Sequence, residues 1–114
     1  MKINNFADLE SVEVKMGGAK DTVLTILVGN DDGSERIIMR HFKVMPKGHT
    51  PHHSHDFEHV VKVEKGIGIV VDEDENEHKI SVGNSFFVAP NVMHQFKNPY
   101  DEPFEFICVI PGGM

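Results

Sequence analysis

Apolar and polar positions alternate over short stretches of this chain, and turn-forming residues separate the stretches. The first clear alternation is "SVEVKM", in which Val12, Val14 and Met16 share one parity. Because successive side chains of a strand point to opposite faces, such stretches predict β-strands. No long stretch places apolar residues at helical spacing, so we expect an all-β protein. Further strands are expected at 21–30, 36–46, 59–66, 67–74, 78–83, 85–90 and 104–111.

Turn signals separate these predicted strands. Asp31-Asp32-Gly33 predicts a hairpin turn, and Pro46-Lys47-Gly48 is expected to end the strand that precedes it. Short strands at this spacing are typical of a sandwich or a barrel, here formed by a single domain. Residues 3–10 break the pattern, and they predict either a helical turn or an arm.

Composition and charge narrow the classes of function. The 114 residues carry a formal net charge of −7, which argues against nucleic-acid binding. No apolar run is long enough to span a bilayer, and residues 1–10 lack the apolar region of a secretory signal. Cys108 is the single cysteine, so no internal disulfide can form. We therefore expect a cytoplasmic protein that binds neither nucleic acid nor membranes.

Histidines are concentrated in one segment. Four of the eight histidines lie within residues 50–59, "TPHHSHDFEH". In strand geometry, His53 and His55 point to the same side. His59 begins the next predicted strand on its more apolar face. The sequence thus predicts three inward imidazoles across one tight connection.

His94 supplies a fourth imidazole, because it follows the turn at Pro90 and shares a strand face with Phe96. If that strand lies beside the first pair, His94 joins the other three histidines. A shared divalent cation would then offset the cost of burying four imidazoles. The alternative is a strand with histidines at the protein surface, since short His-x-His motifs are weak signals. The other histidines are expected at the surface or around the site: His41, His49, His52 and His78.

The spacing of these residues resembles the two motifs of the cupins, a family of small jelly-roll β-barrels. The first motif is matched by His53-Ser54-His55, His59 and Gly66, and the second by Gly83, Pro90, His94 and Asn98. Lys47 stands where the first motif begins with glycine, although Gly48 beside it can make the same turn. His59 stands where most cupins have a glutamate.

Because a histidine replaces that glutamate, the chain is similar to the small single-domain cupins that bind manganese through four histidines. The resemblance implies one divalent transition metal held by His53, His55, His59 and His94. It also implies a homodimer, a cupin barrel core over residues 36–111, and strands within residues 1–35 that complete the barrel or the dimer.

Four neutral ligands would leave the full charge on a divalent metal and, on an octahedral ion, two open positions. Mn or Fe is favoured, and Zn, Ni or Cu could bind the same residues. We expect a metal-dependent oxidoreductase, a dioxygenase or a peroxide-using oxidase, that acts on a small organic molecule. Two alternatives stay open. One is a module that binds or senses a small molecule, and the other is an isomerase or lyase that uses the metal as a Lewis acid.

Strand parity also indicates the walls of a pocket. Arg40 falls on the more apolar face of its strand, where it forms either a buried salt bridge or an anchor for a substrate carboxylate. The resemblance places the strand of Cys108 beside the metal, where this residue is either a small buried hydrophobe or a reactive thiol. The pocket is expected to be lined by Arg40, Val61, Val63, Phe96, Phe106 and Cys108.

Overall fold

Strands make up almost all of the regular structure. The computed structural model describes residues 1–112, and apart from two 3-10 turns its elements in that range are β-strands, which confirms the all-β prediction. The turns are η1 (Phe6–Asp8) and η2 (Asn30–Asp32). The strands are β1 (Ser11–Glu13), β2 (Lys20–Val28), β3 (Ile37–His49), β4 (His59–Lys65), β5 (Ile67–Val71), β6 (Glu77–Ser81), β7 (Ser85–Val88), β8 (Gln95–Lys97) and β9 (Phe104–Pro111). No helix among the described residues has the length and apolar character needed to cross a membrane.

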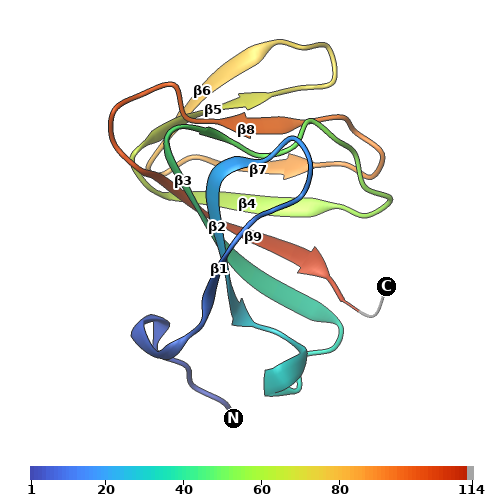
Figure 1. Cartoon of the computed structure of the whole chain (residues 1–114). Helices are drawn as coiled ribbons and strands as arrows, with labels where there is room; N and C mark the ends of the chain where they lie inside the picture. The colour runs from blue at the N-terminus through green and yellow to red at the C-terminus, as the bar shows by residue number, and fades with distance from the viewer. Residues whose placement is uncertain (113–114) are drawn as a thin grey trace.

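The strands form one antiparallel sheet that curls on itself (Figure 1). The strand order is β6-β5-β8-β3-β9-β4-β7, and β2 and β1 extend the sheet from β3. The long β3 belongs to both halves of the sheet, because its residues 37–44 pair with β9 while His49 pairs with β8. The two strands that end this order, β6 and β7, do not pair with each other. The fold is therefore a curled half-barrel, as expected for a cupin.

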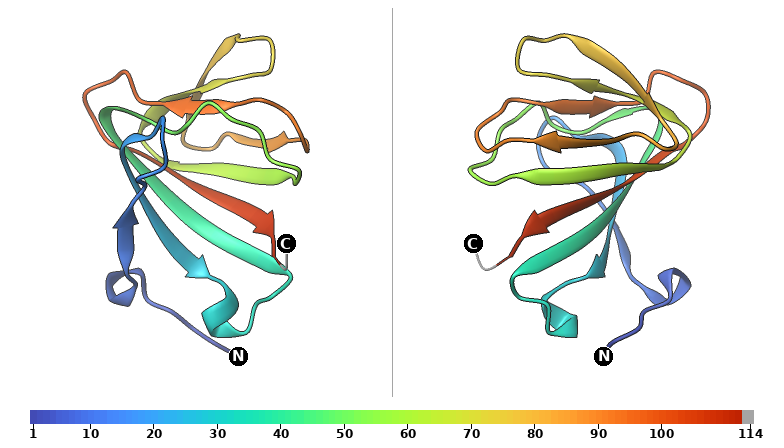
Figure 2. Two further views of the ribbon diagram at one scale, coloured as in Figure 1. Left: turned by 45° about the vertical axis from the view of Figure 1, so that its right-hand side comes forward. Right: turned by 180° about the vertical axis from the view of Figure 1, so that it is seen from behind.

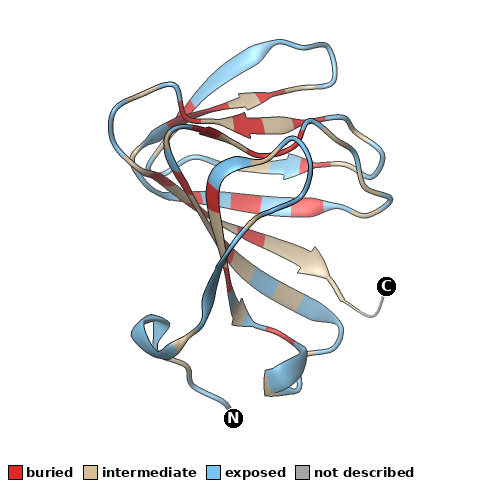
Figure 3. Cartoon of the chain, viewed as in Figure 1, coloured by how far each residue is buried: buried red, intermediate tan, exposed pale blue. Residues whose placement is uncertain are grey.

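The core lies where the two halves of the sheet face each other (Figure 3). Phe96 of β8 stacks on Phe106 of β9, with ring centroids 4.3 Å apart. Alternate residues of β9 are buried, as the strand pattern predicts. The main core cluster consists of Val44, Val61, Val63, Ile80, Phe96, Phe104, Phe106 and Cys108. This packing fixes the inner faces of β3, β4 and β9, which the site uses.

Parts of β2, β3 and β9 extend beyond the curled region, and the N-terminal segment lies beside them (Figures 1 and 2). The segment includes η1, so of the two alternatives for residues 3–10 the helical turn is found. Phe6 of η1 packs edge-on against His41, with ring centroids 5.0 Å apart, and His41 Nε2 lies 3.0 Å from Glu105 Oε1. His41 is therefore a buried residue with a structural partner, and its predicted place at the surface or around the site is wrong.

The strand before Pro46 does not end at this proline. β3 runs on to His49, and the prediction that Pro46-Lys47-Gly48 would end it is wrong. The ladder with β2 is irregular here, because Lys20 pairs with His49 while Thr22 pairs with Val44. A bulge of this kind accommodates proline, which cannot donate a ladder hydrogen bond. The continuation matters, because it carries the chain from β2 and β9 across to β8 and the histidine segment.

Candidate metal and ligand site

Four histidines from three parts of the chain come together on the inner side of the half-barrel. His59 is the first residue of β4, and His94 directly precedes β8. His53 lies outside the strands but forms an isolated antiparallel bridge with His94, through two backbone hydrogen bonds of 3.1 and 2.9 Å. His55 lies in the loop between His53 and β4. The backbone bridge therefore joins the histidine-rich segment to the second motif.

The four imidazole rings lie close together. Ring centroids are separated by 4.2 Å for His53 and His55, 5.4 Å for His53 and His94, and 5.0 Å for His59 and His94. His55 lies 5.2 Å from His59 and 6.1 Å from His94. Imidazoles that bind one ion through nitrogens at about 2.1 Å have centroids roughly 4.5 to 6.5 Å apart. The spacing of the four rings is close to that range.

The four rings do not form a complete coordination sphere in this structure. Among the described residues, no group of three or more His, Cys, Asp or Glu side chains has the arrangement needed to hold a metal ion. The centroid distances alone are close to those expected for rings around one ion. The second side-chain torsion of histidine has a broad energy profile. Rotation about that bond would reorient the ring nitrogens without moving the strands.

Two of the histidines show which nitrogens are available. His94 Nδ1 lies 2.9 Å from the carbonyl oxygen of Val92 and donates a hydrogen bond to it when this nitrogen carries the proton. In that tautomer Nε2 carries the lone pair that can bind a metal. His59 Nδ1 is buried and has no hydrogen-bond partner among the described residues. A buried polar atom without a partner is costly and calls for an explanation. The donor set and this orphaned nitrogen fit a ligand that accepts imidazole lone pairs.

Burial keeps the imidazoles in their neutral form. The pKa of His53 is lowered to about 4, mainly by burial and secondly by the neighbouring His55. The pKa of His59 is lowered to about 3, mainly by burial and secondly by the neighbouring His94. The pKa values of His55 and His94 are also lowered, again mainly by burial. Near neutral pH all four rings are therefore uncharged, which is the form that binds metals.

The histidines face a small chamber of about 150 Å³. Its other walls are largely apolar and come from β2, β3, β8, β9 and the segments that follow β1 and β3. They consist of Val14, Met16, Leu24, Arg40, Phe42, Thr50, Pro51, Phe96, Phe106 and Cys108. No aspartate or glutamate is among the lining residues that the structure describes. The chamber is therefore suited to a small, mainly apolar molecule.

The predicted pocket residues divide into two groups. Arg40, Phe96, Phe106 and Cys108 line the chamber together with the four histidines. Val61 and Val63 point to the same side of the sheet but lie in the close-packed core and do not line the chamber. The predicted lining residues did not include Val14, Leu24 and Phe42. Strand parity already placed Phe42 on the inward face with Arg40, whereas the other two depend on how β1 and β2 join the sheet.

Arg40 has no carboxylate partner among the described residues, so the salt-bridge alternative is not found. Its Nη2 donates to Cys108 Sγ at 3.2 Å, and its guanidinium carbon lies 4.9 Å from the ring centroid of Phe42. Its Nε is buried without a partner. Burial raises the pKa of the Cys108 thiol, against the opposing effect of Arg40, so this thiol stays protonated near neutral pH.

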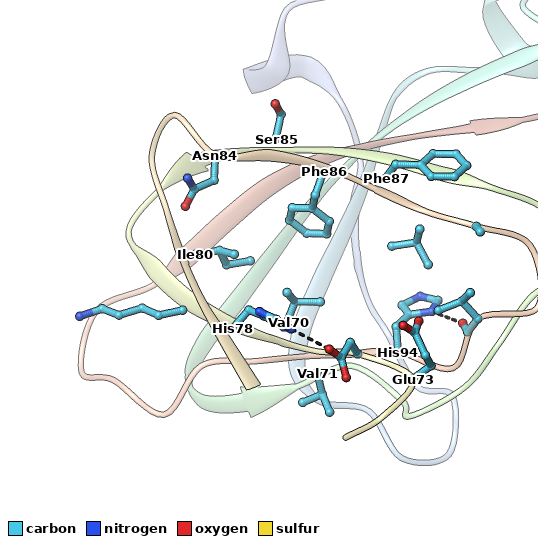
Figure 4. Close-up of a pocket in the computed structure, with 15 residues that line it drawn as sticks. Val70, Val71, Glu73, His78, Ile80, Asn84, Ser85, Phe86, Phe87 and His94 are labelled. Atoms are coloured by element: carbon cyan, nitrogen blue, oxygen red, sulfur yellow. Dashed lines mark hydrogen bonds and ion pairs between the residues drawn. The ribbon is translucent and has the colours of Figure 1, made fainter. Parts of the chain in front are cut away.

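His94 also lines a larger cavity of about 680 Å³. Figure 4 shows this cavity, in which Val70 and Ile80 lie across from Phe86, with His94 at one end. His78 Nε2 lies 2.7 Å from Asp72 Oδ2 among the residues that line it. The cavity lies between β6 and β7, the two strands that do not pair. It is the opening that the half-barrel leaves at its unpaired edges.

The sequence pattern of the cupin domain family matches residues 40–110, which include the histidine cluster, Arg40 and Cys108. The chain belongs to the cupin family. Solved structures with closely similar backbones match this cupin, while no curated protein sequence matches it significantly.

Three solved structures illustrate the likeness. The polyketide cyclase RemF from Streptomyces resistomycificus is 29% identical, with a TM-score of 0.92 over 97% of this chain and 79% of the other. A cupin 2 domain-containing protein from Halorhodospira halophila is 31% identical, with a TM-score of 0.72 over 77% and 62% of the two chains. A sugar phosphate isomerase of the cupin superfamily from Silicibacter pomeroyi is 20% identical, with a TM-score of 0.81 over 94% and 73%, which shows the fold alone.

Proposed function

We propose that this cupin is a metal-dependent enzyme that acts on a small organic molecule in the histidine chamber. The observation that carries the proposal is the convergence of four neutral imidazoles on one small apolar chamber, with one of their nitrogens buried and unpartnered. A purely structural cluster would be expected to satisfy its buried nitrogens through protein hydrogen bonds.

In this proposal His53, His55, His59 and His94 hold one divalent transition metal. His94 would bind through Nε2, because its Nδ1 donates to Val92 and thereby fixes the ring. Mn or Fe is favoured, and Zn, Ni or Cu are suitable for the same donors. When bound, the metal would supply Lewis acidity and, in the case of Mn or Fe, redox chemistry.

The chain's own residues would bind and orient the substrate. Phe42, Phe96 and Phe106 form an aromatic wall that excludes water from an apolar substrate. Cys108 keeps its proton near neutral pH and serves as an acceptor for Arg40, so we assign it no nucleophilic role. None of the described residues that line the chamber carries a carboxylate, so we assign the role of general base to no side chain of the chamber.

Two reaction classes follow. The likeness to a polyketide cyclase, 29% identical over 97% of the chain, favours Lewis-acid chemistry at a carbonyl group, which includes cyclisation and isomerisation. The second candidate is the oxidoreductase expected from the sequence, a dioxygenase or peroxide-using oxidase. It is favoured by the uncharged ligand set, which leaves the charge of a redox metal uncompensated. A protein that only binds a small molecule is the non-catalytic alternative.

Metal content tests the first part of the proposal. The wild-type protein, purified without added metal and then reconstituted, should hold close to one metal ion per chain by elemental mass spectrometry. His59→Ala should lose most of it, whereas His52→Ala, which changes an exposed histidine of the same segment, should keep it. Equal metal content in all three proteins, or none in the wild type, would contradict the histidine site.

A substrate panel separates the reaction classes. The reconstituted protein is incubated with small diketones, phenols and alkenes, with an oxygen electrode and mass spectrometry as readouts. Products that are isomers of the substrate, or that have lost only water, with no oxygen consumed, support the Lewis-acid class. Consumption of oxygen or peroxide supports the oxidoreductase. Reversible ligand binding without any product assigns the protein to the non-catalytic class.

A further inference from the structure

Arg40 occupies an unusual position in this chamber. Its guanidinium group has five N–H donors, yet among the described residues it donates to one acceptor only, the Sγ of Cys108. Its Nε is buried without a partner. Arg40 as a whole is half-buried, and a guanidinium withdrawn from water normally has a carboxylate partner that offsets its desolvation. The contact with the Phe42 ring compensates part of that cost and also fixes the plane of the group.

Arg40 also stands between two cavities. It lines the histidine chamber, and it lines a neighbouring groove of about 610 Å³ at the projecting parts of β2, β3 and β9. The walls of the groove near Arg40 are apolar, and they consist of Leu9, Val12, Leu24, Ile26, Ile38 and Ile110. A ligand that reaches Arg40 from the groove therefore passes along an apolar surface.

The sign of the charge changes between the groove and Arg40. Arg40 provides a positive charge at the inner end, where the chamber has no acidic side chain among its described residues. Glu10, Asp31 and Asp32 line the groove and carry negative charge. An anionic group is repelled by these carboxylates and attracted by Arg40. The acidic lining thus disfavours an anion in the groove, and Arg40 is the cationic side chain among the described lining residues that attracts one.

We propose that Arg40 anchors the carboxylate of an organic acid whose apolar part extends toward the groove. The inference deepens the proposed function, because it assigns the substrate class of the same chamber. The planar guanidinium suits a two-point contact with a carboxylate. Arg40 is thus a positioning residue for the substrate, because it holds the carboxylate end beside the four histidines while the apolar part extends toward the groove.

Binding of a matched pair of probes tests the anchor. The full-length protein is treated with a chelator, and calorimetry measures its affinity for 3-phenylpropanoate and for the neutral amide of the same acid. The wild type should prefer the carboxylate. Arg40→Met removes the charge and retains an apolar chain, so it should weaken carboxylate binding about 10- to 100-fold and leave amide binding within about twofold.

Lys43→Met is the matched control, because it removes one positive charge from the same strand at the opposite parity and away from the chamber lining. It should leave the affinity for both probes unchanged. Arg40→Lys retains the charge without the planar fork, and it should bind the carboxylate with an affinity between those of wild type and Arg40→Met. This variant and the preference of the wild type also test the anchor if Arg40→Met fails to fold.

The anchor and the metal site can fail separately. Equal affinity of the wild type for carboxylate and amide, no binding of either, or no loss in Arg40→Met would overturn the anchor, whatever the metal content. A preference for the carboxylate that depends on Arg40 would support it, even in a protein that binds no metal. Chelation before the titration ensures that a carboxylate bound to metal is not mistaken for one bound to Arg40.

Discussion

At the scale of single residues, the dominant fact is that four imidazoles are held uncharged inside the protein. Desolvation opposes the protonated form of each ring, and the neighbouring rings and Arg40 add to this effect. The folded chain therefore resists protonation at this cluster, whereas the same histidines in the unfolded chain titrate near their ordinary pKa of 6.5.

This difference predicts acid destabilisation of the metal-free protein. Between pH 6.5 and the lowered values of about 4 for His53 and about 3 for His59, the unfolded state binds more protons than the folded state. The free energy of unfolding should thus have its highest value above pH 6.5 and should fall as the pH drops through this window. Urea titrations of chelator-treated protein from pH 7.5 to 4 measure it.

A variant isolates the contribution of the cluster from that of the carboxylates. His53→Gln removes one half-buried titrating group, so its loss of stability on acidification should be smaller than in the wild type. His52→Gln changes an exposed histidine and should follow the wild-type curve. If the curves of wild type and His53→Gln run parallel, the burial of this imidazole does not control the pH dependence.

The prediction that the four histidines lie close together rested on grounds that were only partly correct. Strand parity places Arg40 and His59 inward because each lies in a regular strand. His53 and His55 lie in a loop, where parity has no meaning, and it is the backbone bridge from His53 to His94 that brings this segment to the cluster. Such a bridge between distant segments has no local signal, so only the resemblance of the motifs pointed to it.

At the scale of secondary-structure elements, β5 is held against β9 by a glycine. A β-carbon added at Gly68 would overlap the ring of Phe104, which is completely buried. The absence of a side chain thus lets the two halves of the sheet approach each other. This contact helps to set the distance between β8 and β9, on which the stacked rings of Phe96 and Phe106 depend.

Gly68→Ala should therefore destabilise the protein by about 1 to 3 kcal/mol, the usual cost of overpacking a core. Chemical denaturation monitored by circular dichroism measures the effect. Gly17→Ala is the control, because a β-carbon there would meet nothing within 4 Å, and its effect should stay within about 0.5 kcal/mol. Equal stability of the two variants would show that Phe104 can move aside.

The positions of most strands were predictable from alternation, and β9 was predicted with its observed ends. The error at Pro46 has a physical cause. Proline ends a regular ladder, but an irregular one with a bulge tolerates it, and local sequence does not distinguish the two cases. The short β8 was expected only as the partner strand of His94, because three residues are too few to show a period.

At the scale of the whole molecule, the half-barrel and its family could be predicted from joint motif spacing, whereas the two large openings could not. One lies at β6 and β7, which do not pair with each other, and the other lies along the projecting parts of β2, β3 and β9 (Figure 2). Pairing between distant strands decides where a sheet stops. Cytoplasmic localisation stays a prediction from the sequence.

The projecting strands lead to a last prediction, which is that two copies of this chain form a homodimer. Large apolar side chains are exposed there, including Val12 at 47% and Ile26 at 51% of their full accessibility. Among the described strands β1 pairs with β2 only, and a second copy could pair with its other side or cover this apolar surface.

Light scattering after size-exclusion chromatography should give twice the mass of the chain. Val12→Asp places a charge on the edge strand and should shift the protein to a monomer, because a buried unpaired carboxylate is costly. Val82→Asp is the control, since Val82 is still more exposed, at 64%, but lies in the turn between β6 and β7, away from the projecting strands. A monomeric wild type would refute the dimer, and a dimer that survives Val12→Asp but not Val82→Asp would place the interface at the opposite end of the sheet.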